Sequence, residues 1–581
     1  MISPQALRPC VPRPLALSLT LSLAISLSGP VLGQVSADLV LHNGRIVTLH
    51  DRHPEGRAIA ILGDRVMAVG REGDIDAYSG EDSEVIDLEG ALAIPGFIEG
   101  HGHFLGLGDT QLQLDLRGAE TWDEIVALVA GAVKETEPGV LIRGRGWHQE
   151  KWVRRPSPDI DGLPIHTGLS SVSPENPVIL THASGHATYA NAFAMDLCGI
   201  SSETADPEGG QVVRDAEGNP IGVFRETASA LLGRARLAAG PPDIQRQAEL
   251  AVQECLSKGI TSFQDAGSSF ANVDHFKAMV DDGSLGVRLW VMLRESNAQL
   301  KKHIADYRII RYGDSRLTVH AIKRSIDGAL GSHGAWLLNP YADLPESSGL
   351  NTTSTDSIAE TARIAIENDF QLCVHAIGDR ANREVLDIFE LTFFDYPKKT
   401  GLRWRMEHAQ HLHPKDVPRF AILGVVASMQ GIHCTSDAPW VYARLGAERA
   451  ESGAYMWQSL MKAGVVVTNG TDAPVEDVDP IASYYASVSR KLADGSVFFA
   501  DQRMTRVEAL RSYTLNAAYA AFEEDIKGSL GPGKLADITV LSQDILSIEE
   551  DLIPATKVLY TIVGGLLMYQ APDDVEEETD R

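Results

Sequence analysis

The sequence predicts an α/β protein built on a (β/α)8 TIM-like barrel. A composite β-sandwich from both termini and a large insert after the first barrel strand complete the predicted fold. Three observations lead to this prediction. The middle of the chain alternates short apolar runs with helical stretches, and both ends are rich in short strands. A segment too long for an ordinary loop separates the first two barrel strands.

The chain has 581 residues, more than one compact core accommodates, and its 44% hydrophobic content is that of a globular protein. We expect a signal peptide at 1–33, the N-terminal part of the sandwich at 34–96, the barrel at 97–520 with an inserted subdomain at about 104–248, the C-terminal part of the sandwich at 521–571, and an acidic tail at 572–581.

The N-terminus has the three parts of a secretory signal. Arg8 and Arg13 form a basic region, residues 15–27 are rich in Leu, Ser and Ala, and Val31-Leu32-Gly33 offers small residues for cleavage near Gly33. An uncleaved anchor is the alternative, but the apolar run is shorter than a full membrane span. We therefore expect a periplasmic or secreted protein with no stable membrane insertion after cleavage.

The charge and the cysteines exclude several classes of function. A formal net charge of -28 argues against nucleic-acid binding, which needs a basic surface. The cysteines that follow the signal show no CxxC spacing, so neither a thiolate zinc site nor a redox motif is indicated. The expected partner is a small molecule, and a homodimer is compatible with the sequence.

Both ends of the chain carry strand signals. We expect a strand pair at 38–50 around Asn43-Gly44 and a second hairpin at 58–70 that turns at Gly63-Asp64. Further β-rich stretches lie at 85–96, 533–544 and 558–570. One small sandwich that flanks the central domain accounts for both groups.

The centre contains about eight strand-and-helix units, the number that closes a parallel barrel. We place the strands at Phe97 and at residues 260–265, 289–293, 317–323, 371–376, 403–408, 425–429 and 465–468. Helix starts are predicted at Asp356, Asp379 and Pro414. The insert contains a helix at 122–137 and a hairpin at 209–222, and we expect it to cover the barrel mouth.

Six residues of metal-ligand type lie where barrel strands end. His101 and His103 are two apart, so on a strand both imidazoles point to one face. The others follow at later strands: Lys323, His375, His408 and Asp472. Singly, each has an ordinary explanation, such as a hydrogen-bonded core histidine, a salt-bridged lysine or a turn-capping aspartate. All strand ends of a closed barrel meet at one mouth, so together they favour a metal centre.

Eight motifs occur in the order typical of one family: DLVLHNGRIVT, PGFIEGHGH, HASGHATYAN, KRSIDGALGS, VHAIGDRAN, RMEHAQ, NGTDAP and GPGKLADITVL. The chain thus resembles the amidohydrolase superfamily, specifically amidohydrolase family 3, a large-insert branch that includes the N-substituted formamide deformylases. The resemblance runs over nearly the whole chain beyond the signal. It implies a metal-dependent barrel with a composite β-sandwich.

The resemblance also implies roles for the six residues. His101 and His103 would bind the buried metal, His375 and His408 would bind a second metal, and a carbamylated Lys323 would bridge the two. Asp472 would contact metal and act as the general base. The implied cofactor is Zn2+, as two ions, with another divalent metal as the alternative.

Histidines of the insert are candidates for a lid role. His182 and His186 are predicted to assist catalysis, with ordinary loop histidines as the alternative, and His148 is a third candidate. Trp147 and Trp152 are expected to form an apolar wall for an acyl or aryl group.

The expected function is hydrolysis of a non-peptide amide C–N bond, an EC 3.5 type reaction on an N-acyl or N-formyl amine. Hydrolysis of a lactone, ester or carbamate at the same centre is the first alternative. A catalytically inactive barrel that acts as a binding protein is the second.

Overall fold

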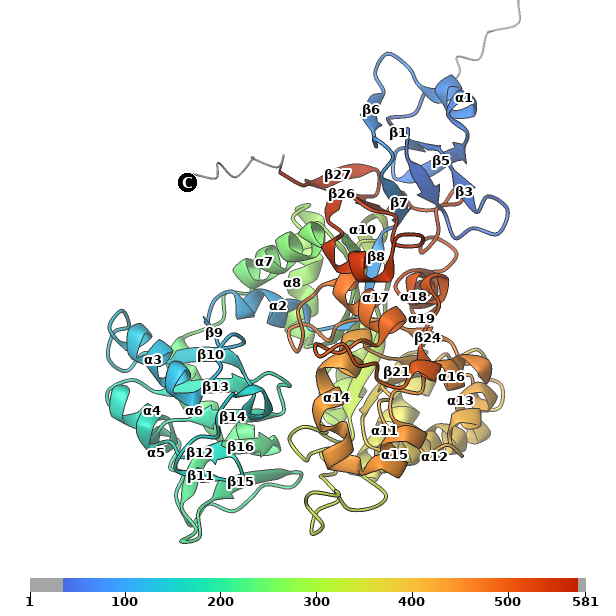
Figure 1. Cartoon of the computed structure of the whole chain (residues 1–581). Coiled ribbons are helices and arrows are strands. Elements are labelled where there is room, and N and C mark those ends of the chain that lie inside the picture. The colour runs from blue at the N-terminus through green and yellow to red at the C-terminus, as the bar shows by residue number, and fades with distance from the viewer. Residues whose placement is uncertain (1–34, 573–581) are drawn as a thin grey trace, which may run out of the picture.

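The computed structural model describes residues 35–572. The predicted signal peptide lies outside these residues, as does all but the first residue of the predicted acidic tail. Figure 1 shows the sandwich at the top, the barrel below it and the insert beside the barrel. Within residues 35–572, no helix is long and apolar enough to cross a membrane.

Eight parallel strands form the barrel, which confirms the predicted fold class. In order around the barrel they are β8 (Phe97–Gly102), β17 (Ile260–Ser268), β18 (Arg288–Leu293), β20 (Leu317–Ser325), β21 (Gln371–Ala376), β22 (Arg405–His408), β23 (Val426–Ser428) and β24 (Val467–Thr468).

The first barrel strand and the segment that follows the last one meet through close backbone contacts. The amide of Gly100 donates to the carbonyl of Asn469 at 3.1 Å. A Cβ at position 100 would lie 2.2 Å from that carbonyl oxygen, so only glycine permits the approach. This contact brings the ends of β8 and β24, which carry predicted ligands, side by side.

Helices surround the barrel. They are α7 (Ile244–Ser257), α8 (Phe270–Asp281), α9 (Asn297–His303), α11 (Thr355–Glu367), α12 (Asp379–Asp395), α13 (Val417–Leu423), α14 (Gly431–Leu445), α15 (Ala447–Gly453), α16 (Trp457–Lys462), α17 (Pro480–Ser489), α18 (Arg506–Ser512) and α19 (Leu515–Ala520). Short β19 (Ile309–Arg311) and α10 (Tyr312–Ser315) precede β20.

Two of the predicted helix starts are displaced. Helix α11 is capped by Ser354, whose side chain accepts from the amide of Ser357, so Asp356 lies inside the first turn. The proline in the first turn of α13 is Pro418, and Pro414 lies in the preceding turn. Asp379 does open α12, as expected.

Both ends of the chain build the sandwich. One sheet has the order β5 (Arg65–Gly70), β4 (Ala58–Leu62), β1 (Leu39–His42), β6 (Glu84–Asp87). The other has the order β27 (Leu566–Gln570), β26 (Val558–Val563), β25 (Ile538–Leu541), β7 (Leu92–Pro95), β2 (Arg45–Val47), β3 (Glu55–Gly56). Their facing apolar side chains form one core, which includes Leu41, Ile59, Ile538 and Ile562.

The strand pair predicted around Asn43-Gly44 is wrong. β1 pairs with β4 and β6, whereas β2 pairs with β3 and β7 in the other sheet. The chain crosses between the sheets at this turn, and a Cβ on Gly44 would meet the Leu88 side chain at 2.4 Å. The hairpin predicted at 58–70 is confirmed by the antiparallel pair β4–β5.

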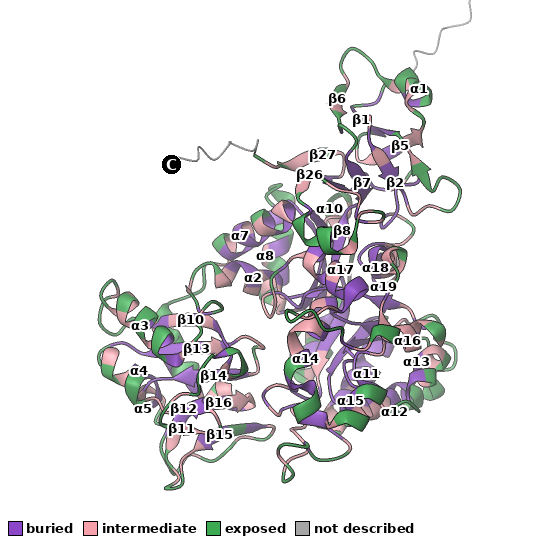
Figure 2. Cartoon of the chain, in the orientation of Figure 1, coloured by how far each residue is buried: buried purple, intermediate pink, exposed green. Residues whose placement is uncertain are grey.

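The insert folds around apolar cores of its own (Figure 2). Its six-stranded sheet has the order β15 (Gly210–Arg214), β16 (Pro220–Glu226), β14 (Ala187–Ala190), β13 (Val178–His182), β10 (Ile142–Trp147), β9 (Leu114–Asp115). Its helices are α3 (Trp122–Val133), α4 (Thr167–Val172), α5 (Ala192–Leu197) and α6 (Gly233–Arg236), and α2 (Phe104–Thr110) leads into it from the barrel. Two short strands, β11 (Asp159–Ile160) and β12 (Leu163–Pro164), pair with each other in the insert, and the short helix α1 (Glu72–Ile75) lies near the N-terminus.

A buried ion pair joins the sandwich to the barrel. Arg288 at the start of β18 donates to both carboxylate oxygens of Asp537, at 2.8 and 3.0 Å. Burial disfavours the charged carboxylate, but the Arg288 charge and hydrogen bonds still lower the pKa of Asp537. The pair therefore stabilises the contact only while Asp537 is ionised.

We expect Asp537→Ala to lower the free energy of unfolding by about 3 kcal/mol, because it leaves Arg288 buried and unpaired. The stabilisation by Asp537 is fully present above the pKa of about 4 that its carboxyl has in the unfolded chain. It is lost as the pH falls through the lower pKa that the carboxyl has in the folded protein. Urea unfolding at pH 7 and at acid pH measures both effects. The exposed Asp82→Ala is the control, with an expected change within about 0.5 kcal/mol. Equal losses in the two variants would contradict this role of the pair.

Candidate metal centre

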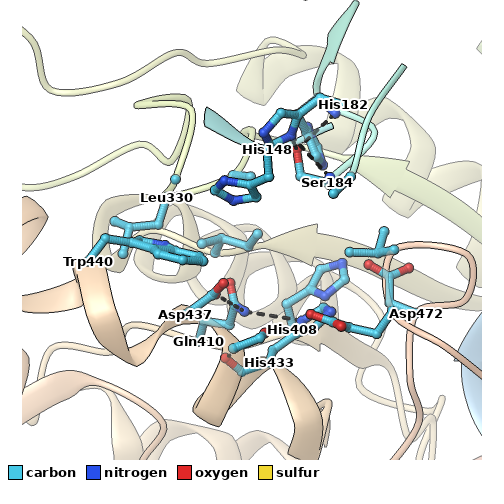
Figure 3. Close-up of a pocket in the computed structure, with 18 of the residues that line it drawn as sticks. His148, His182, Ser184, Leu330, His408, Gln410, His433, Asp437, Trp440 and Asp472 are labelled. Atoms are coloured by element: carbon cyan, nitrogen blue, oxygen red, sulfur yellow. Dashed lines mark hydrogen bonds between the residues drawn. The ribbon is translucent and has the colours of Figure 1, made fainter. Parts of the chain in front are cut away.

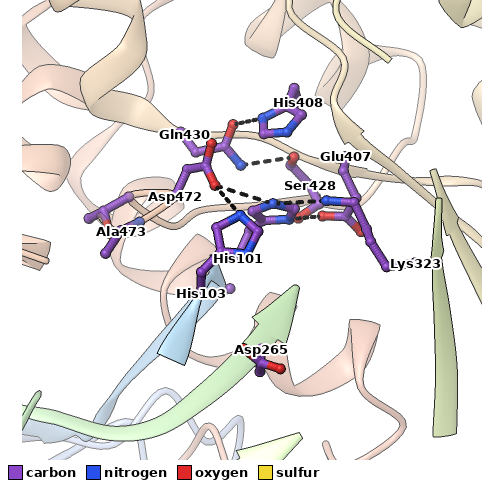
Figure 4. Close-up of polar contacts among 12 residues, drawn as sticks. His101, His103, Asp265, Lys323, Glu407, His408, Ser428, Gln430, Asp472 and Ala473 are labelled. Carbon is purple, nitrogen blue, oxygen red and sulfur yellow. Dashed lines mark hydrogen bonds and ion pairs between the residues drawn. The ribbon is translucent and has the colours of Figure 1, made fainter. Parts of the chain in front are cut away.

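The structure brings the six predicted ligand residues together at the carboxyl ends of the barrel strands. Figure 4 shows His101, His103, Lys323, His408 and Asp472 in this cluster. The Asp472 Oδ1 atom lies 3.5 Å from His101 Nε2 and 3.3 Å from His103 Nε2. Lys323 Nζ lies 3.3 Å from the same His101 nitrogen. The His408 ring completes the cluster, with its centroid 4.8 Å from that of His101 and 4.4 Å from that of His375.

The donor set fits a divalent cation. One ligand atom each of His101, His408 and Asp472 lie within 4.8 Å of one another, and all three residues are buried. Asp472 Oδ1 and His375 Nε2 are buried without a hydrogen bond of ordinary geometry. Buried polar atoms are nearly always partnered, and imidazole and carboxylate donors are ligands that zinc accepts. These side chains could therefore hold a metal ion.

Glu407, which the sequence reasoning missed, orients His101. Its carboxylate accepts a hydrogen bond from His101 Nδ1 and is itself held by Arg405, whose Nε donates at 2.7 Å. Burial opposes ionisation, but Arg405 and His101 hold the pKa of Glu407 below its ordinary range. A carboxylate on Nδ1 directs Nε2 toward the metal position, the usual arrangement around metal-binding histidines.

The backbone conformation at His408 allows the consecutive residues Glu407 and His408 both to face the metal centre. On a regular strand, Glu407 and His408 would point to opposite faces. His408 has a φ of 74°, in the left-handed region, which turns its ring out of the strand pattern. Its Nδ1 pairs with Gln430 Oε1 at 2.8 Å, which leaves Nε2 for the centre.

Lys323 is a buried lysine with an unusual environment. Among residues 35–572, no carboxylate forms an ion pair with its Nζ, and the one hydrogen-bond partner is His101. Burial lowers the pKa of Lys323 to about 8, so roughly a tenth of the amine is neutral at pH 7, far more than for an ordinary lysine. Asp472, by contrast, has its pKa held well below the ordinary value, because the neighbouring histidines outweigh the effect of burial.

The insert places one of its histidines next to the cluster. The His186 ring lies 5.1 Å from that of His375, and His186 Nδ1 pairs with Glu226 Oε2 at 2.7 Å. His182 uses both ring nitrogens within the insert. Its Nδ1 pairs with Ser184 Oγ at 2.8 Å (Figure 3). Its Nε2 pairs with Gln149 Oε1 at 3.1 Å.

The apolar wall predicted from Trp147 and Trp152 is wrong. Both indoles pack into a core of the insert, and Trp147 Nε1 donates to the carbonyl of Leu180 at 3.0 Å. Trp440 and Leu330 are the large apolar side chains that line the pocket beside the metal centre (Figure 3). Trp440 comes from α14, where its helical context gave no functional signal.

Comparison with known proteins identifies the family. The model of the amidohydrolase family matches residues 84–569. This chain belongs to the amidohydrolase family. The amidohydrolase is 31% identical to Protein LONG AFTER FAR-RED 3 of Arabidopsis thaliana, with 92% of each chain covered. It is 29% identical to the putative amidohydrolase YtcJ of Bacillus subtilis (strain 168), over 91% of this chain and 99% of the relative.

A further relative has a named activity. N-substituted formamide deformylase of Arthrobacter pascens is 27% identical, over 92% of this chain and 98% of that protein. Among solved structures, an uncharacterized metal-dependent hydrolase from Pyrococcus horikoshii OT3 superposes with a TM-score of 0.69 at 25% identity. The superposition covers 88% of this chain and 99% of that one. Family membership and these similarities identify the chain as a hydrolase.

Proposed function

We propose that this hydrolase cleaves a non-peptide amide C–N bond in an N-acyl or N-formyl amine, with a metal-activated water. The observation that carries the proposal is the convergence of His101, His103, Lys323, His375, His408 and Asp472 at the barrel mouth. The similarity to an N-substituted formamide deformylase supports an amide as the substrate.

The proposed cofactor is a pair of Zn2+ ions. His101 and His103 would hold one ion, His375 and His408 the other, and Lys323 would bridge them as a carbamate. When bound, the ions lower the pKa of water and polarise the scissile carbonyl. To form the carbamate, the neutral Lys323 amine adds CO2 and releases one proton, which gives an anionic oxygen donor. Among the described residues no carboxylate forms an ion pair with Lys323 Nζ, which supports this assignment.

The side chains supply the proton transfers. Asp472 is ionised, so its carboxylate can take a proton from the attacking water and return it to the departing amine. His186 is held at Nδ1 by Glu226, which raises its pKa against the effect of burial and favours a proton for donation. We assign to His186 the hydrogen bond to the developing oxyanion. His182 would support that loop from within the insert.

Lys323→Ala should reduce bound zinc from two equivalents to at most one, because it removes the side chain proposed to bridge the two ions. Elemental analysis of the natively purified protein measures this, and Lys301→Ala, an exposed lysine paired with Glu360, is the control. Retention of two equivalents in Lys323→Ala would exclude the bridging role.

Two other functions predict different results. A lactone, ester or carbamate hydrolase would use the same centre, and a substrate panel of N-acyl amines, formamides, N-acyl amino acids and lactones distinguishes it. A binding protein that has lost catalysis would contain less than one equivalent of zinc after native purification. The proposed function requires bound metal and turnover of an amide in that panel; turnover of lactones alone would contradict it.

A further inference from the structure

A second chamber borders the metal centre, and Trp440 is not among its lining residues. It shares His375, His408 and Asp472 with the pocket that contains Leu330 and Trp440, and it is further lined by Arg145, Arg294 and hydroxyl side chains. Arg294 is exposed and Arg145 is half-buried, so both positive charges can be reached from the chamber. Positive charges that line a cavity attract anionic ligands.

Arg294 is the unpaired member. It directly follows β18, so it stands at the barrel mouth, and its side chain is accessible to the chamber. Among residues 35–572, its guanidinium has no hydrogen-bond or ion-pair partner. Surrounding protein lowers the pKa of Arg294, and its charge in turn contributes to the lowered pKa of Lys323. The guanidinium therefore faces the metal centre with its donors free.

Residues at the end of β17 hold Arg294 at the barrel mouth. Its side chain lies across Gly267, where an added Cβ would meet Arg294 Cδ at 2.8 Å. Gly267 has a φ of 132°, which L side chains rarely adopt. The amide of Arg294 donates to the carbonyl of Ser268 at 2.8 Å. Backbone and side chain are thus both positioned by the end of β17.

Arg145 adds a second charge from the insert. Its guanidinium donates to the carbonyls of Pro474, at 3.2 Å, and Ala183, at 3.0 Å. Both partners are neutral, so the positive charge of Arg145 is not compensated by a carboxylate among its hydrogen-bond partners. The chamber therefore receives one arginine from the barrel and one from the insert.

The carboxylates of the chamber are engaged elsewhere. Glu226 pairs with His186 at 2.7 Å. Asp327 accepts from the amides of Ile377, Gly378 and Trp336 at 2.8 to 3.0 Å. Asp472 faces His101 and His103. No carboxylate of the described residues forms an ion pair with either arginine, so both positive charges are available to an anion from outside.

We propose that this chamber binds a carboxylate carried by the substrate, with Arg294 as its main ligand and Arg145 as the second positive charge. The inference rests on the proposed function and narrows it: the substrate is an amide with an anionic group on one side of the scissile bond. Leu330 and Trp440, in the neighbouring pocket, would contact an apolar group on the other side of the scissile bond. Arginine suits a carboxylate because its planar fork can donate two parallel hydrogen bonds.

Matched amides test the proposal on the zinc-loaded full-length protein. N-Benzoylglycine and N-methylbenzamide differ only in the carboxylate, and N-phenylsuccinamic acid places the carboxylate on the acyl side instead. We expect kcat/KM to favour a carboxylate amide, and Arg294→Met to lower that value about 10- to 100-fold, the loss of a charge-assisted hydrogen bond. Arg294→Lys should recover part of the loss. The ratio of kcat/KM for the carboxylate amide to kcat/KM for N-methylbenzamide should fall in Arg294→Met, because only the first compound carries the group that Arg294 binds.

Equilibrium binding separates this proposal from the proposed function. Calorimetric titration of the inactive Asp472→Asn protein with the same compounds needs no turnover. Tighter binding of a carboxylate amide that Arg294→Met abolishes supports the anion site, even if no amide is hydrolysed. Hydrolysis of N-methylbenzamide without a carboxylate preference would uphold amide hydrolysis and overturn the anion site. Equal binding of all three compounds, or no binding of either carboxylate amide, would also overturn it.

Discussion

Asp472→Asn should lower kcat for amide hydrolysis about 10³-fold while the protein keeps most of its metal, because general acid–base catalysis typically contributes 10²- to 10⁴-fold. Asparagine preserves the shape of the side chain, but it cannot accept the proton of the attacking water. The histidine ligands on the other barrel strands remain in place to bind metal. Single-turnover kinetics and elemental analysis of the same preparation measure both quantities.

The control for this substitution is Asp82→Asn, which changes an exposed aspartate just before β6 of the sandwich and should leave kcat unchanged. An Asp472→Asn protein with full activity would show that another group takes the proton. Loss of both metal and activity would show that Asp472 acts mainly as a ligand.

Glu407→Ala should lower the free energy of unfolding by about 3 to 5 kcal/mol, because it leaves Arg405 buried without its carboxylate partner. It should also weaken zinc affinity about 10- to 100-fold, the usual cost of removing the carboxylate behind a metal-binding histidine. Urea unfolding of the metal-free protein and competitive zinc titration measure the two effects separately.

The contrasting variant is Glu390→Ala, which removes an exposed carboxylate from Arg419. Surface ion pairs of this kind contribute about 0 to 1 kcal/mol, and no metal effect is expected. If Glu407→Ala lost stability without loss of zinc affinity, the carboxylate would belong to the barrel core and would not orient His101.

The sequence predicted the barrel well because each buried strand is a short apolar run that can be recognised locally. It failed where a backbone turn redirects the chain. At Asn43-Gly44 the turn signal is genuine, but the chain passes between two sheets there, which no local pattern distinguishes from a hairpin. At Glu407-His408, strand alternation allowed one of the two residues to face the centre, and the φ of 74° at His408 allows both.

The insert explains the remaining failures. Trp147 and Trp152 were expected to form an apolar wall for the substrate, but the insert is large enough to need an apolar core, and they fill it. The chamber formed by Arg294 and Arg145 joins residues from a barrel strand and from the insert. Their meeting depends on how the two parts pack, which periodicity and turn signals do not determine.

The most direct test of the metal centre is a crystal structure of the zinc-loaded protein with diffraction data recorded at the zinc absorption edge. We expect anomalous density from zinc among His101, His103, His375, His408 and Asp472, with additional density on Lys323 Nζ for the carbamate. Absence of anomalous density among these side chains, with zinc found elsewhere on the chain, would contradict it.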